Sequence, residues 1–390
     1  MSTAPAYKKA AAVALDRHLP GLDGLRGVAC LLVFVYHLRW LAGDPPLFVG
    51  NFRALSILKN CDIGVAIFFA LSGLLLSIPF WRAMQSGASW PDFRRYFWRR
   101  ACRIVPAYYA CLLVVYLFRG GTYTFHGFID FLLHAGFVHT FSDQSYLSVH
   151  GLLWTIGLEF QFYLFLPVMM AGLAWLARRI DIRIACMALF TATLLLQAAA
   201  SAAIIAIEPL ISDRFLGPGG IVISCGTIFH FLPFFALGML GGGLCLFWRD
   251  RQMRAAPLVW GCLALSGTIG ILLFSNEGAW RQDFTWMINM AVFSLLAASL
   301  PAAPALARFF EARPLVFAGQ ISYGIYLWHE LVLRAVFSGT IRGQLAGWPL
   351  VLAGGAIALA VTVLVAWLSY RMIERPAMKV SYPFATASTT

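Results

Sequence analysis

The stretch that decides the fold is GLDGLRGVACLLVFVYHLRWLA, residues 21–42. It is long enough to cross a bilayer as one helix, which takes about 20 mostly apolar residues. It nevertheless carries Asp23, Arg26 and His37, and ionisable groups within a spanning helix are costly and usually functional. Helical spacing places the three on one face, with Arg26 and His37 about 16 Å apart along the axis. A polar stripe therefore joins a guanidinium near the helix start to an imidazole near its other end.

The composition is that of an integral membrane protein. The chain has 390 residues, of which 61% are hydrophobic and 12% charged, and its mean hydropathy is +0.77. The net charge of +12 lies in short clusters between apolar segments, so it indicates membrane topology and not nucleic-acid binding. The eight cysteines form no CxxC pair and lie mostly in apolar segments, as small buried hydrophobes do.

The hydropathy pattern predicts an all-α polytopic protein with about ten transmembrane helices. Lysine and arginine concentrate on the side that holds both termini, above all in loop 82–103, so both termini are expected in the cytoplasm and the protein in the cytoplasmic membrane. We expect a tail at 1–20, one membrane domain at 21–375 and a second tail at 376–390. The predicted spans are 22–42, 62–82, 103–118, 152–177, 184–207, 219–247, 257–275, 284–306, 315–339 and 347–372.

Glu159 is the acidic residue expected to act with His37. The fourth span runs inward from about Leu152, which places Glu159 roughly 11 Å below the outer surface, at the depth of His37. A carboxylate beside an imidazole fixes its tautomer and raises its basicity, as a general base requires. The alternative is that Glu159 pairs with an arginine for structure alone, and in an apolar span we favour function.

The segment before the third span reads RRYFWRRACRIVP, residues 94–106. Arg100 and Arg103 are about one turn apart on one face, with Arg99 beside them. Such a cluster binds phosphates. It is equally consistent with a topology signal that contacts lipid headgroups.

The ninth span carries GQISYGIYLWHELV, residues 319–332. Ser322, Tyr326 and His329 fall on one side of it, which indicates a cavity lining. Hydrogen bonding between helices would explain each residue equally well.

Two further patterns argue against other classes of site. His126, Asp130 and His134 are spaced to share a helix face, but nothing else in that segment marks a closed site, so a solvated face is favoured and no metal is expected. The chain has no GxSxG, HExxH, P-loop or GxGxxG motif, which weighs against hydrolases, zinc proteases and nucleotide-driven motors.

The recurring motifs resemble those of the acyltransferase-3 family, integral membrane enzymes that acylate cell-surface sugars, lipids and some secreted small molecules. The resemblance covers nearly the whole chain, in order, and it is carried by LDGLRGVACLLVFVYH, FFALSGLLLS, RRACRIVPAYY, LLWTIGLEFQFYLFLP and ISYGIYLWHELV. The first block is the most specific.

The resemblance implies roles for individual residues. His37 matches the essential histidine and Arg26 its basic partner, with Asp23 on the same stripe. Arg100 and Arg103 match the pair assigned to the acyl-CoA end. Glu159 matches the family's acidic position, with Trp154 as the tryptophan of its motif. The residue after the family's acid is usually polar or a tryptophan, and here it is Phe160. Some members of the family also carry a fused esterase-like domain, which is not expected in this chain.

The implied function is transfer of an acyl group, expected to be acetyl, from cytosolic acyl-CoA to a hydroxyl of an extracytoplasmic acceptor. His37 would act as general base or carry the acyl group transiently. The acceptor would be an envelope saccharide, a lipid-linked glycan or a secreted small molecule, and Ser322, Tyr326 and His329 would line its cavity. The alternative is a multispanning transporter, against which the lack of paired repeats counts.

Overall fold

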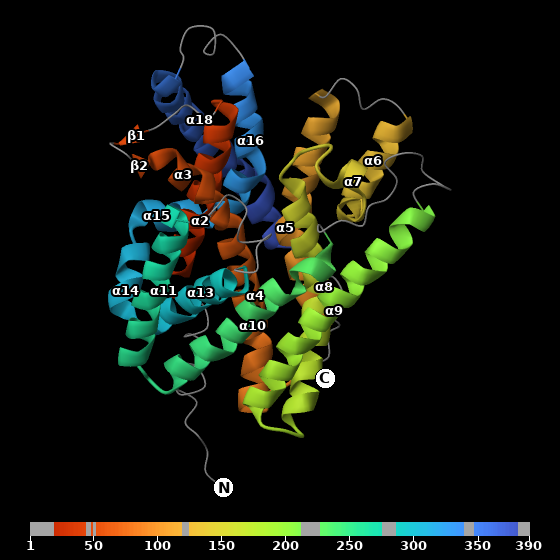
Figure 1. The fold of residues 1–390 in the computed structure, drawn as a ribbon, viewed down its shortest axis with the longest axis vertical. Coiled ribbons are helices and arrows are strands. Elements are labelled where there is room, and N and C mark those ends of the chain that lie inside the picture. Colours follow the sequence, from red (N-terminus) through yellow and green to blue (C-terminus); the bar gives the residue numbers. More distant parts are fainter. Residues whose placement is uncertain are drawn as a thin grey trace.

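The computed structural model describes residues 19–43, 48–49, 52–118, 125–211, 227–274, 286–338 and 347–380. The architecture is all-α, as predicted, and suits a polytopic membrane protein (Figure 1). Two-residue strands β1 (Phe48–Val49) and β2 (Phe52–Arg53) form a short antiparallel pair after the first helix.

Every predicted span overlaps a helix of the structure. The long helices are α2 (Leu22–Leu41), α4 (Ile63–Ser86), α5 (Phe93–Phe118), α8 (Leu153–Ala177), α9 (Ile182–Ile211), α10 (Ile228–Asp250), α11 (Ala255–Phe274), α13 (Trp286–Ser299), α16 (Ser322–Ser338) and α18 (Gly347–Ser369). The shorter ones are α3 (Ala54–Lys59), η1 (Asn60–Asp62), α6 (Phe125–Ala135), η2 (His139–Phe141), α7 (Asp143–Tyr146), η4 (Leu300–Ala302), α14 (Pro304–Phe310), α15 (Arg313–Gln320), the π-helical turn η5 (Tyr370–Glu374) and α19 (Arg375–Met378).

Two of the predicted spans are broken. Within the described residues, eight helices are long and apolar enough to cross a membrane, and a ninth candidate is a pair bent by 107° between residues 286–302 and 304–310. Ala303 at that bend precedes a proline, which disfavours helical geometry there, and its backbone is not helical. The segment predicted at 315–339 is split at Ile321 into α15 and the 17-residue α16.

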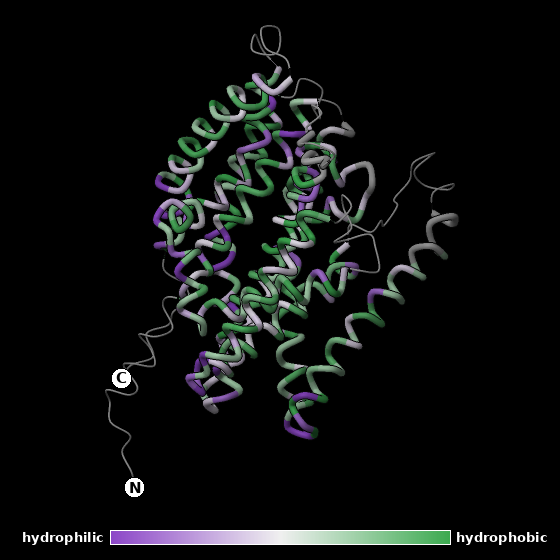
Figure 2. Tube along the Cα trace, turned by 60° about the vertical axis from the view of Figure 1, so that its left-hand side comes forward, coloured by the Kyte–Doolittle hydropathy of each residue, from purple (hydrophilic) through white to green (hydrophobic). Residues whose placement is uncertain are grey.

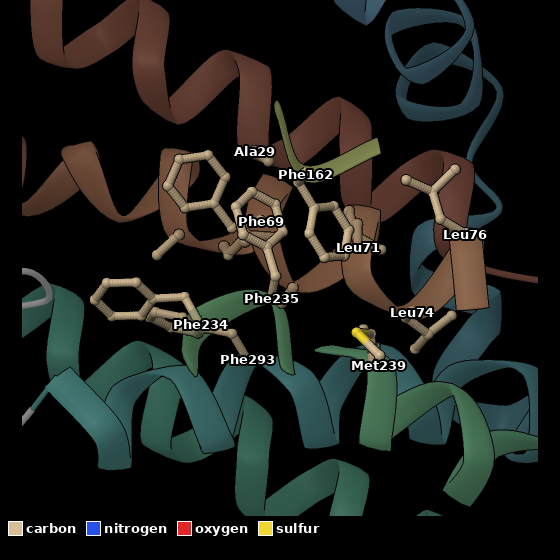
Figure 3. Packing of buried hydrophobic residues seen from close by; sticks show 14 of the residues in the cluster. Ala29, Phe69, Leu71, Leu74, Leu76, Phe162, Phe234, Phe235, Met239 and Phe293 are labelled. Carbon is tan, nitrogen blue, oxygen red and sulfur yellow. The ribbon is translucent and has the colours of Figure 1, made fainter. Parts of the chain in front are cut away.

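The apolar interior is built around the crossing of α4 and α10. Phe69 and Leu74 of α4 pack against Phe235 and Met239 of α10, and all four are buried (Figure 3). Figure 2 shows the long helices hydrophobic over most of their length, with hydrophilic residues gathered at turns such as the one between α8 and α9. Because lipid is as apolar as these side chains, close packing and not escape from water holds the helices together.

Helix α2 lies directly against the backbone of α14 and α15. A Cβ atom at Gly24 would lie 1.6 Å from the carbonyl oxygen of Phe310, and one at Gly319 would lie 1.8 Å from that of Asp23. The backbone N–H of Gly21 also donates to Glu311 at 2.5 Å. These contacts fix the depth and rotation of the helix that carries Arg26 and His37.

The substitution Gly319→Ala is expected to lower the thermal unfolding midpoint of the protein in detergent, because its methyl group needs space that the backbone of Asp23 occupies. Overpacking of this kind costs about 1–3 kcal/mol. The matched control is Gly172→Ala in α8, where nothing lies within 4 Å of the added carbon, and it should leave the midpoint unchanged or raised. Equal midpoints for the two variants would contradict the close contact.

Candidate active site

A cavity of about 330 Å³ lies where α2, α4, α5, α8 and α16 converge. Its polar lining comes from five helices that are separate in the sequence, so the fold itself assembles it. These residues are Asp23, Arg26, Ser72, Arg100, Arg103, Thr155, Glu159, Tyr163, Ser322, Tyr323 and Tyr326.

Three guanidinium groups face this cavity. Arg26 comes from α2, where it lies 3.6 Å from Asp23, and Arg100 and Arg103 come from α5. The Nε atom of Arg100 is buried and makes no hydrogen bond within the part of the chain that the structure describes. An excess of guanidinium over carboxylate in a shielded site favours an anionic ligand held by several N–H donors.

Arg100 and Arg103 lie together in this lining, as their spacing predicted, and the structure adds Arg26 from α2, which the spacing did not predict. It separates Arg99 from them. Arg99 is exposed and does not line the cavity. The helical turn explains the difference, since Arg100 and Arg103 share a face that Arg99 does not.

Glu159 lies in the arginine cavity and makes no contact with His37. Its Oε1 atom accepts hydrogen bonds from the hydroxyls of Ser72 and Tyr163, each at 2.9 Å. The expected pairing of Glu159 with His37 is therefore wrong. Two residues at equal depth in the membrane can still face different neighbours: Glu159 faces α4, whereas His37 faces α16.

His37 is paired with a second histidine. Its Nδ1 atom lies 2.9 Å from the carbonyl oxygen of Val33 and 3.3 Å from Nε2 of His329 on α16. The two rings meet edge to face, with centroids 5.0 Å apart. His329, expected in the cavity lining, instead lies against the candidate base.

A buried group beside this histidine pair was missed by sequence reasoning. Glu330 pairs with Arg334 one turn along α16, and its Oε2 atom lies 3.3 Å from Nδ1 of His150. His150 also lies 3.2 Å from the carbonyl oxygen of Leu327 through Nε2. An intramembrane glutamate four residues before an arginine was the available signal for this group.

Tyr326 joins the cavity to the histidine pair. Its hydroxyl lies 2.7 Å from Oγ1 of Thr155, which itself donates to Leu152, so Tyr326 is the donor. Its ring lies edge to face against His329, with centroids 5.9 Å apart. Ser322 also lines the arginine cavity. Its predicted role, in a cavity for the acceptor, stays a prediction.

Trp154, also predicted to contact substrate, does not line the cavity. Its indole is buried among aromatic rings, with centroids 6.3 Å from Phe69, 5.6 Å from Phe231 and 5.5 Å from Tyr146. It packs one side of α8, next to the turn that presents Thr155.

The histidines of α6 and η2 form a buried stack, so the solvated face predicted at His134 is wrong. The rings of His134 and His139 lie parallel, 4.0 Å apart, and His134 contacts Asp130 at 3.3 Å. No group of three or more metal-binding side chains gathers in the described ranges, and the side chain of His126 lies outside them.

Comparison with known proteins agrees with this architecture. The model of the acyltransferase domain family matches residues 19–367. The chain belongs to the acyltransferase-3 family. It is 26% identical to the peptidoglycan O-acetyltransferase OatA of Listeria monocytogenes over 93% of this chain and 56% of the relative. It is 24% identical to the O-acetyltransferase OatA of Staphylococcus aureus over 96% of this chain and 59% of that relative.

The chain thus spans less than two thirds of the length of these relatives. No solved structure gives a significant match.

The histidine stack makes the protein sensitive to acid. Burial, together with the neighbouring His134, lowers the pKa of His139 to about 3. In the unfolded chain this histidine binds a proton near pH 6.5, whereas in the folded protein it stays neutral down to about pH 3. The free energy of unfolding therefore falls as the pH drops from about 6.5 toward 3, by up to about 1.4 kcal/mol per pH unit.

We therefore expect the thermal unfolding midpoint in detergent to fall between pH 7.5 and 5.5, and to fall less in His139→Phe, which keeps a stacking ring without a titrating nitrogen. An equal fall in the two proteins would show that another group is responsible.

Proposed function

We propose that this protein transfers an acyl group, acetyl in the first instance, from acyl-CoA to a hydroxyl of an envelope polysaccharide, with His37 as general base. The observation that carries the proposal is that the pair formed by His37 and His329 lies next to a cavity lined by three arginines, in a chain of the acyltransferase-3 family. One helix, α2, carries both His37 and Arg26.

The donor end of the proposal rests on the charge of the cavity. Arg26, Arg100 and Arg103 supply donors for phosphate oxygens, and the carboxylate in the same cavity, Glu159, is hydrogen-bonded to Ser72 and Tyr163. The cavity has the size of a small-molecule site. It would take the acyl end of the donor while phosphates contact arginines at its rim. The predicted topology supports entry from the cytoplasm, where the arginine-rich start of α5 is expected.

The chemistry would take place beside Tyr326. His37 removes the proton of the acceptor hydroxyl as its oxygen attacks the thioester carbonyl. The new C–O bond forms, the C–S bond breaks, and the thiolate of CoA receives the proton from His37 as it leaves. In the two-step alternative His37 attacks first and holds the acyl group before the acceptor takes it. Both routes need the same histidine at the same place.

The acceptor class follows from the relatives. One curated relative is named as a peptidoglycan O-acetyltransferase, which supports a glycan of the envelope as acceptor. Since the chain spans only part of these relatives, the membrane domain is proposed to move the acyl group into or across the membrane. The assay below tests whether it also places the group on the glycan.

The test is transfer of label from radioactive acetyl-CoA by protein reconstituted in lipid vesicles with peptidoglycan fragments. His37→Ala is expected to lower transfer by at least about 100-fold, the usual contribution of a general base. His230→Gln, a change at a partly buried histidine that contacts Gln197 and lies outside both polar clusters, is the control and should retain transfer. Full transfer by His37→Ala, or solute flux without transfer of label, would overturn the proposal.

A further inference from the structure

We propose that His329 is a positioning residue that fixes the tautomer of His37, so that the basic atom of the site is Nε2 of His37. The inference rests on the proposed function for its chemical meaning, but the tautomer itself follows from the hydrogen-bond geometry of the two rings.

The tautomer of His329 is determined by its own helix. Its Nδ1 atom lies 3.0 Å from the carbonyl oxygen of Ile325 and 2.8 Å from that of Tyr326. Carbonyl oxygens only accept hydrogen bonds, so Nδ1 carries the proton. In the neutral ring Nε2 then carries a lone pair and accepts hydrogen bonds. His329 is fully buried, which favours that neutral ring.

That lone pair faces His37. Nδ1 of His37 lies 3.3 Å from Nε2 of His329 and 2.9 Å from the carbonyl oxygen of Val33. Both neighbours are acceptors, so Nδ1 of His37 must be the donor, and its proton is shared between them. The remaining nitrogen, Nε2, carries the lone pair of His37. None of the described residues forms a hydrogen bond to this atom, so its lone pair is not taken up within the described part of the protein.

A neutral partner suits this place better than a carboxylate. Glu330 is already engaged with Arg334 and His150, and the other charged group near His37 on its own helix is Arg39. When His37 takes a proton on Nε2, its Nδ1–H becomes the donor of a charge-assisted bond to His329 and to Val33, which stabilises the cation. If the Nδ1 proton of His37 moved to Nε2 of His329, Nδ1 of His37 would become a lone pair facing the carbonyl oxygen of Val33, and this contact favours keeping the proton on His37.

The assignment of Nε2 as the reactive atom of His37 holds for both the one-step and the two-step route of acyl transfer. A proton taken from the acceptor and an acyl group taken from the thioester would both arrive at Nε2, since Nδ1 is occupied. His329 therefore has the same role in the one-step and the two-step route, and it need not touch the substrate.

The experiment compares His329→Gln with His329→Leu. The glutamine side chain can return a carbonyl oxygen to the place of Nε2 and still accept from His37, whereas leucine of similar size cannot. In His329→Leu we expect kcat to fall at least about 10-fold, with the KM for acetyl-CoA changed less than about 3-fold. The acidic limb of the pH profile should move about one unit lower, as expected for the loss of one hydrogen bond to a charged group. In His329→Gln the limb should stay where it is in the unmodified protein.

An unshifted limb in His329→Leu, or the same shift in both variants, would overturn the positioning role and leave His329 as packing alone. A second readout does not depend on activity. Nitrogen NMR of the protein with labelled histidine, compared with His37→Ala to assign residue 37, should show an unprotonated Nε2 at that residue. A protonated Nε2 overturns the tautomer whatever the activity, whereas the absence of acyl transfer with the expected tautomer overturns only the proposed function.

Discussion

The rest of the structure depends on the contact between the backbone of α2 and those of α14 and α15. Gly24 and Gly319 leave room only for main-chain atoms at this contact, so α2 has one depth and one rotation available to it. That rotation aims Arg26 into the cavity at one end and His37 at His329 at the other. Membrane helices gain little from apolar burial against one another, and close packing of this kind is what can hold a polar stripe in place.

The charged groups of the site are arranged so that each end of the stripe has a different electrostatic character. The arginine end is cationic, with one carboxylate held by two hydroxyl groups. The histidine end is built from imidazoles, and its carboxylate, Glu330, is neutralised by Arg334. Tyr326 lines the first and contacts the second. Under the proposed function, an anion would be bound at one end and a proton moved at the other, and α2 carries a residue of each end, Arg26 and His37.

Much of this could be predicted from the sequence, because it depends on local periodicity. The all-α class, the stripe on α2 and the shared face of Arg100 and Arg103 all follow from 3.6 residues per turn. Partners across helices could not be predicted, because depth says nothing of lateral position: Glu159 reached Ser72 and not His37. The breaks at Ala303 and Ile321 were also missed, because the spans were predicted from hydropathy, although Pro304 was a signal for the first break.

The most direct test of the central claim is to measure the affinity for CoA, by calorimetry on purified protein, in variants changed at one end of the stripe or at the other. If the arginines bind the donor and the histidine acts on it, the double variant Arg100→Gln with Arg103→Gln should bind CoA at least about 10-fold more weakly, the loss expected for one or more charge-assisted bonds. His37→Ala should bind CoA as the unmodified protein does. Unchanged affinity in the arginine variant, or loss of CoA binding in His37→Ala, would contradict the separation of the two ends.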